Sequence, residues 1–339
     1  MRIQKLMVFV ICLLVLLCSV SAFSEKPETF TSDDYRYQIK ADGTAEIVRF
    51  IGNNDIQEVV VPAVLDGHSV MTIGDKAFSG SKSLTSMTLP ASVTTIGRSA
   101  FSNCESLTSI TLPDSVTTIG DGAFSRCTSL TSIFIPDSVI SIKGNPFVNC
   151  SKLATIQVSP DHPALAVMDG VLFSKADKKL VCYSGGLRQH SYAVPQGTIS
   201  IGEDAFSGCT SLTSITLSDS VTTIEDSAFS SCSSLTSITI PDSVISIEGN
   251  PFNGCDNLTK IQVSPDHPAL AVMGGVLFSK ADKKLVCYPM TFQISSYEVP
   301  QGIISIGDGA FCRCTSLTSI TIPDSVTTIG NDAFSWCTS

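Results

Sequence analysis

The feature that most constrains the fold of this chain is a period of 23 residues. Leucines recur at that interval at Leu84, Leu107, Leu130 and Leu153, and again at Leu212, Leu235 and Leu258. A fixed period of this length is typical of a solenoid, in which each unit covers the apolar side of its neighbour. The sequence therefore predicts an array of stacked units rather than one globular core.

Residues 107–129 show how one unit is built. Apolar and polar residues alternate from 107 to 112, turn residues follow at 113–115, and a second short apolar run occupies 116–119. After Gly120, the spacing of Ala123, Phe124 and Cys127 is that of one side of a helical turn. We therefore expect an α/β solenoid with short parallel strands and single-turn helices.

The first 22 residues have the pattern of a signal peptide. Arg2 and Lys5 precede an apolar run over residues 6–17, and the small residues of Val20-Ser-Ala22 predict cleavage after Ala22. An uncleaved anchor is the alternative, because residues 6–23 carry no charge and approach spanning length. Either outcome predicts a secreted or cell-surface protein, and no second apolar stretch of spanning length follows.

The rest of the chain divides into a cap and a repeat array. Residues 23–55 are expected to form an N-terminal cap, with a hairpin of residues 35–39 and 45–50. The solenoid is expected over residues 56–339, with irregular modules at about 153–190 and 258–295. Each module should contain two strands joined by an exposed loop. Because the chain ends immediately after a complete unit, we expect a fragment or a terminus covered by another chain.

The two modules belong to a duplicated block of 105 residues. Residues 156–183 recur as 261–288 with one difference, Asp169 in the first copy and Gly274 in the second. The near-identity of the two copies indicates a duplication and is not by itself evidence for a function.

The repeat itself resembles a known family. The pattern Leu-x-x-Ile-x-Leu-Pro-x-x-Val-x-x-Ile-Gly-x-x-Ala-Phe-x-x-Cys, complete in residues 107–127, resembles the BspA-type, or Treponema pallidum-type, leucine-rich repeat. The resemblance extends over about 56–339. It implies a curved parallel-strand solenoid on a secreted or surface-attached protein, and adhesion to host matrix proteins or to other microbes.

Composition narrows the choice of partner. With 21 Lys and Arg against 31 Asp and Glu, the net charge is −10, which argues against nucleic acid and against anionic membranes. Serine and threonine recur at the outward strand positions, so the surface should be rich in hydroxyl groups. The expected partner is an extracellular protein or a glycan.

Cysteine and histidine offer no reaction centre. Eight cysteines share one repeat position, and we interpret them as buried free thiols, with disulfides or a metal site as alternatives. Cys312, outside that position, should be the most accessible of the remaining cysteines. His162 and His267 lie in Pro-Asp-His-Pro turns and should be solvated. No nucleophile, base and acid occur together in a catalytic pattern, so we predict no enzymatic activity, no cofactor and no metal.

The predicted binding surface combines an exposed aromatic residue with the module loops. Phe134 is the main exception on a face of serine and threonine, and basic residues stand out in both modules. The predicted partner-binding residues are Phe134, Lys175, Lys178, Lys179, Tyr183, Arg188, Tyr192, Lys280, Lys283, Lys284, Tyr288 and Tyr297. The alternatives are a merely solvated face, a structural or decoy surface coat without a ligand, and an ice- or crystal-binding threonine array.

Overall fold

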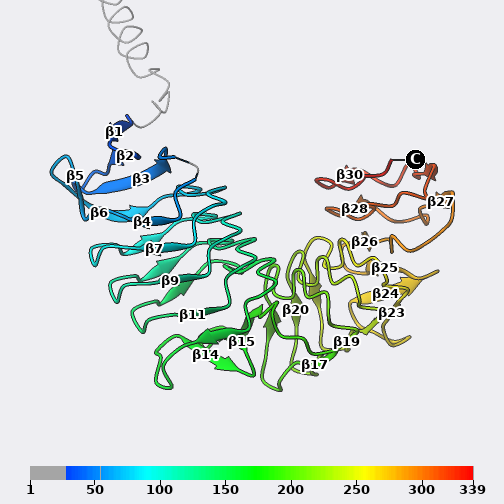
Figure 1. The fold of residues 1–339 in the computed structure, drawn as a ribbon. Coiled ribbons are helices and arrows are strands. Elements are labelled where there is room, and N and C mark those ends of the chain that lie inside the picture. The colour runs from blue at the N-terminus through cyan, green and yellow to red at the C-terminus, as the bar shows by residue number, and fades with distance from the viewer. Residues whose placement is uncertain (1–27, 54, 339) are drawn as a thin grey trace, which may run out of the picture.

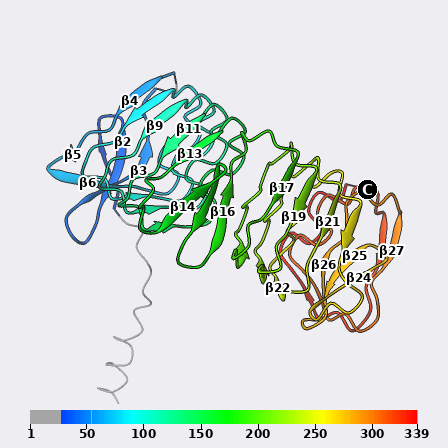
Figure 2. The same ribbon diagram turned by 90° about the horizontal axis from the view of Figure 1, so that it is seen from below.

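The computed structural model describes residues 28–53 and 55–338, and these form a solenoid of stacked parallel strands (Figures 1 and 2). Each regular unit contributes two short strands, which pair with the equivalent strands of the neighbouring units one repeat away. Thus Ile96, Ile119 and Ile142 are register partners in consecutive units. The predicted solenoid with short parallel strands is confirmed.

The first strands of the units form one side of the coil. They are β4 (Glu58–Val60), β7 (Ser86–Thr88), β9 (Ser109–Thr111), β11 (Ser132–Phe134), β13 (Thr155–Gln157), β17 (Ser191–Ala193), β19 (Ser214–Thr216), β21 (Ser237–Thr239), β23 (Lys260–Gln262), β27 (Ser296–Glu298) and β29 (Ser319–Thr321).

The second strands form another side. They are β6 (His68–Ile73), β8 (Thr95–Ile96), β10 (Thr118–Ile119), β12 (Ser141–Ile142), β18 (Ser200–Ile201), β20 (Thr223–Ile224), β22 (Ser246–Ile247), β28 (Ser305–Ile306) and β30 (Thr328–Ile329).

The predicted single-turn helices are wrong: the described residues contain no helix. The segments after the second strands, which we call turn segments, place a residue with positive φ before the alanine and another before the cysteine, as at Ser99 (54°) and Asn103 (59°). A right-handed helix cannot continue through left-handed residues. The amides that a helix would use internally instead cross to the next unit, as in Phe101 N–H to Ala123 O (2.7 Å) and Asn103 N–H to Ser125 O (2.8 Å).

Antiparallel strands precede the first units. β1 (Phe30–Ser32), β2 (Tyr35–Ile39) and β3 (Ala45–Phe50) form a meander, where the sequence predicts a hairpin over residues 35–39 and 45–50. β3 then pairs in parallel with β6, which also receives the short strand β5 (Val64–Leu65). The Phe50 ring stacks on Phe78 at 5.3 Å, so the meander covers aromatic core of the first unit.

Each module adds a three-stranded meander to the stack. The first consists of β14 (Leu165–Met168), β15 (Val171–Ser174) and β16 (Lys179–Tyr183), and the second of β24 (Leu270–Met273), β25 (Val276–Ser279) and β26 (Lys284–Cys287). β16 and β26 restart the parallel ladder by pairing with β18 and β28. Because β12 and β22 do not pair with the meander that follows them, each module creates an interruption, which we call a seam.

An asparagine spans each seam. Asn145 is buried, its Nδ2 donates to the carbonyl of Asp204 at 2.8 Å, and its Oδ1 accepts from the Phe147 amide at 2.9 Å. Asn250 makes the same contacts with Gly309 (2.8 Å) and Phe252 (3.0 Å). The side chain thus replaces the backbone bonds that regular units exchange.

Aromatic rings and thiols line the turn segments from within. Phe78, Phe101, Phe124 and Phe147 stack at 5.3 to 5.6 Å, a favourable spacing for aromatic pairs. The repeat cysteines are free thiols, and Cys127 Sγ donates to the Phe101 carbonyl at 3.2 Å. Burial raises the pKa of Cys104 to about 12, so this thiol is not primed as a nucleophile. Cys312, expected to be accessible, is also buried, with 7% of its surface exposed.

Candidate binding surface

The outward side chains of the first strands lie on one side of the coil, which we call the strand face. Its strands pair in four ladders, β4-β7-β9, β11-β13, β17-β19-β21-β23 and β27-β29. Strands β9, β11, β13, β19 and β23 share one pattern, in which a buried central residue lies between two exposed ones. The exposed positions are mostly serine and threonine, as the repeat predicts. Such a face is polar, and its backbone is held by the parallel pairing of the strands.

Phe134 interrupts this face. Its side chain is 50% exposed, whereas most equivalent positions hold polar residues, namely Thr88, Thr111, Gln157, Thr216, Thr239, Gln262, Glu298 and Thr321. The other two equivalent positions are apolar but not aromatic: Val60, which is 74% exposed, and Ala193. It borders a hollow of about 570 Å³ between β13 and β14, lined also by Val158, Ala166 and Lys175. The structure thereby brings two predicted binding residues, Phe134 and Lys175, to the same hollow.

Lys175 is held in place by the module. Its Nζ donates to the backbone carbonyl of His162 at 2.6 Å, and Lys280 makes the equivalent bond to His267. The expectation that these histidines are solvated is wrong, because both are fully buried. The Nε2 of His162 donates to the Pro136 carbonyl (3.1 Å), and its Nδ1 accepts from the Ala164 and Leu165 amides. The histidine ring thus supplies hydrogen bonds to the backbone of the turn that leads into β14.

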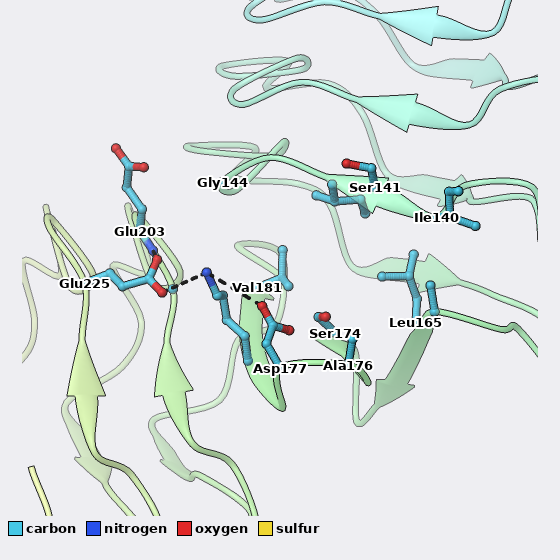
Figure 3. Close-up of a pocket in the computed structure, with 14 residues that line it drawn as sticks. Ile140, Ser141, Gly144, Leu165, Ser174, Ala176, Asp177, Val181, Glu203 and Glu225 are labelled. Carbon is cyan, nitrogen blue, oxygen red and sulfur yellow. Dashed lines mark hydrogen bonds and ion pairs between the residues drawn. The ribbon is translucent and has the colours of Figure 1, made fainter.

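The other basic residues do not act as one patch. Lys178, Arg188 and Lys283 are exposed. Lys179 instead pairs with carboxylates on its own side of the first seam, where its Nζ lies 2.8 Å from Glu225, just after β20, and 4.0 Å from Asp177 (Figure 3). Lys284, its counterpart in the second module, is partly buried and has no carboxylate within ion-pair distance among the described residues.

The predicted tyrosines are core residues, which corrects their assignment as partner-binding groups. Tyr183 and Tyr288 are each only 2% exposed and Tyr192 is 8% exposed, while Tyr297 is partly buried. Tyr183 lies 5.3 Å from Phe206 and Tyr288 lies 5.1 Å from Phe311, so each tyrosine restarts the aromatic column after a seam. Burial raises the pKa of both to about 12.

The signal for this burial lies in the sequence. Tyr183 precedes Phe206 by one repeat of 23 residues, and Tyr288 precedes Phe311 by the same interval. Tyr192 likewise pairs with Ile215, whose side chain points inward. The repeat register, followed through the modules, would therefore have placed all three in the interior.

Two further features of the described residues bear on function. No helix among residues 28–53 and 55–338 is long and apolar enough to cross a membrane. Within the same residues, no group of three or more His, Cys, Asp or Glu side chains is placed to hold a metal ion.

Stacked parallel strands with a consensus of inward leucine, isoleucine, phenylalanine and cysteine define a leucine-rich repeat protein. The family described as BspA type leucine rich repeat region matches the chain in six copies, over residues 50–167, 181–289 and 284–339. The chain therefore belongs to this family.

Solved structures of bacterial leucine-rich repeat proteins are similar to it. A leucine-rich cell surface protein from Faecalibacterium prausnitzii A2-165 is 33% identical, with 92% of this chain and 74% of that chain covered and a TM-score of 0.44. A leucine-rich repeat protein from Eubacterium ventriosum ATCC 27560 is 21% identical, covers 92% and 95% of the two chains, and has a TM-score of 0.62. The latter shares the fold. Among curated proteins, none matches the chain significantly.

Proposed function

We propose that this chain is a secreted or cell-surface binding protein without catalytic activity, which adheres to an extracellular protein or glycan. The signal-peptide pattern of residues 1–22 lies outside the described residues and supports the location. The solved cell-surface protein from Faecalibacterium prausnitzii is a relative at 33% identity, in agreement with that location.

The exposed Phe134 ring beside the hollow is the observation that carries this proposal. Large aromatic side chains dominate the binding energy of protein interfaces, and they act best in apolar pockets near the centre of a contact. Here the ring projects from a paired strand, so the backbone that carries it is fixed before a partner arrives. Fixed geometry reduces the entropy lost on binding.

The duplicated block provides a matched experiment. Phe134→Thr gives the first copy the residue of the second, and Thr239→Phe makes the reciprocal change. Binding of the mature chain to fibronectin, laminin, collagen and bacterial cells should fall at least about fivefold for Phe134→Thr, the loss expected of an interface anchor. It should not fall for Thr239→Phe.

The result also separates adhesion from its alternative. A structural or decoy coat protein has no specific ligand, so neither substitution would change its retention on any of these surfaces. Equal binding by the parent chain and Phe134→Thr would therefore reject the proposed role of this face. Thermal unfolding of both variants should match the parent, since residue 134 is exposed.

A further inference from the structure

The first seam leaves one edge of β12 unpaired. β12 pairs with β10, and no strand of the described residues pairs with its other edge. In the preceding unit, the carbonyls of Thr117 and Ile119 accept bonds from the next unit, from Ile140 N–H (3.1 Å) and Lys143 N–H (3.0 Å). The equivalent carbonyls of Ile140 and Ile142 accept no backbone bond from the part of the chain described. An unpaired edge is a template for another strand.

A pocket lies along this edge, with a volume of about 360 Å³. Ile140, which precedes β12, and Ser141 of β12 lie on one side of it, and Leu165 and Ala176 of the module lie opposite (Figure 3). Ile140 is 68% exposed, an unusual fraction for a large aliphatic residue beside a strand. The pocket therefore offers free backbone acceptors together with an apolar contact surface.

The end of the pocket remote from Ile140 is acidic. Glu203 and Glu225 lie there, and Lys179 offsets only one negative charge by pairing with Glu225. Glu203 is exposed and has no ion pair with any described residue. Partial desolvation of its carboxyl, and then the nearby charges of Asp121, Asp226 and Glu225, raise the pKa of Glu203, against a smaller opposing effect of Arg98. A cation placed here would relieve repulsion between these carboxylates.

We propose that the seam pocket binds an extended basic peptide segment of an extracellular protein, which adds a strand to β12 and places a lysine or arginine near Glu203. In strand addition, backbone bonds supply affinity and side-chain pockets supply specificity. An apolar side chain of the segment packs between Ile140 and Leu165. This site rests on the proposed binding role but is separate from the Phe134 hollow.

The second seam is a weaker version of the same site. β22 also ends its ladder, and Ile245, the counterpart of Ile140, is 65% exposed. Asp308 stands in place of Glu203, but Gly330 stands in place of Glu225. The second seam thus lacks one carboxylate, so the first seam binds basic segments more tightly.

The test uses a fluorescent, acetylated nine-residue peptide of alternating valine and lysine, titrated against the mature chain. Two control peptides have glutamate in place of lysine, or an N-methyl group on the central valine, which removes a backbone donor. The lysine peptide should bind at least about tenfold more tightly than either control, and its affinity should fall as salt is raised. Equal affinity of the lysine and glutamate peptides would overturn the proposal.

Matched variants locate the site. Ile140→Ser should weaken peptide binding by about fivefold or more, whereas Ile245→Ser, at the equivalent exposed position of the second seam, should not. Glu203→Gln should weaken it about two- to fivefold, the range of an exposed ion pair. All three residues are exposed, so the variants should fold, as circular dichroism would verify.

Hydrogen exchange gives an independent readout. The peptide's own backbone amides should exchange more slowly in the complex, because strand addition makes them donate to the Ile140 and Ile142 carbonyls. Unchanged exchange of the peptide amides would reject strand addition even if the peptide binds. Phe134→Thr should leave peptide affinity unchanged. If matrix and cell binding depend on Phe134 but the peptide does not bind, only the seam proposal fails. If the peptide binds as expected but Phe134→Thr leaves matrix and cell binding unchanged, only the role of the Phe134 hollow is rejected.

Discussion

Replacement of Asn145 by alanine should cost the protein about 2–4 kcal/mol of unfolding free energy. The side chain is 1% exposed and makes two hydrogen bonds, one across the first seam to the Asp204 carbonyl and one within its own turn from the Phe147 amide. Without it, the buried Phe147 amide loses its acceptor, at a cost of roughly 1–3 kcal/mol, and the bond to the Asp204 carbonyl, worth about 1 kcal/mol, is also lost. The Asp204 carbonyl still accepts a hydrogen bond from the Ser207 amide, so the substitution does not leave this carbonyl without a donor.

Urea unfolding followed by circular dichroism would measure the effect, and hydrogen exchange at the Phe147 amide would locate it. Asn250→Ala should cost a similar amount, because it makes the same pair of bonds at the second seam. Asn257→Ala is the control: this exposed side chain makes one bond, to the Ser233 carbonyl, and its loss should cost less than about 1 kcal/mol. If Asn145→Ala costs no more than Asn257→Ala, the seam is not held by its asparagine.

Two further predictions concern buried polar groups near the modules. Burial raises the pKa of Asp204 to about 7, so its contribution to stability is full below the ordinary pKa of about 4 and is lost as the pH rises through 7. The stability of Asp204→Asn relative to the parent chain should therefore rise between about pH 4 and 7, by at most about 4 kcal/mol. Urea unfolding of both proteins at a series of pH values would measure this, and a stability difference that does not change with pH would refute it. The Tyr183 hydroxyl is buried with no hydrogen-bond partner among the described residues, so Tyr183→Phe should leave the melting temperature unchanged or raise it. A clear loss of stability would show that the hydroxyl has a partner.

The repeat period predicted the stack and its register, because a constant spacing of inward residues along the chain requires each unit to lie on the one before it. Ile96, Ile119 and Ile142 are register partners, as the 23-residue interval implies. The helices were predicted from the spacing of Ala123, Phe124 and Cys127, which also suits two consecutive tight turns. What decides between them is a left-handed residue such as Arg126 (φ 58°), and arginine carries no local signal for that conformation.

The sequence predicted those residues of the candidate site whose exposure follows from their position in a strand. Phe134 occupies an outward strand position, and its exposure follows from strand alternation. Tyr183 and Tyr288 were misplaced because they were grouped with the exposed basic loops of the modules, although their sequence separation from Phe206 and Phe311 keeps the repeat interval. The seam pocket depends on β14 lying opposite β12, a long-range arrangement that no local pattern in residues 165–168 specifies.

The turn segments give the solenoid an electrical direction. In each regular unit their amides point toward the following unit, as from Ser99 to Asp121 and from Phe101 to Ala123. Peptide groups aligned in this way add their dipoles, as they do in an α-helix, although here the column runs across successive units rather than along one segment. Asn145 donates in the same sense, so the polarity of this column continues past the inserted meander.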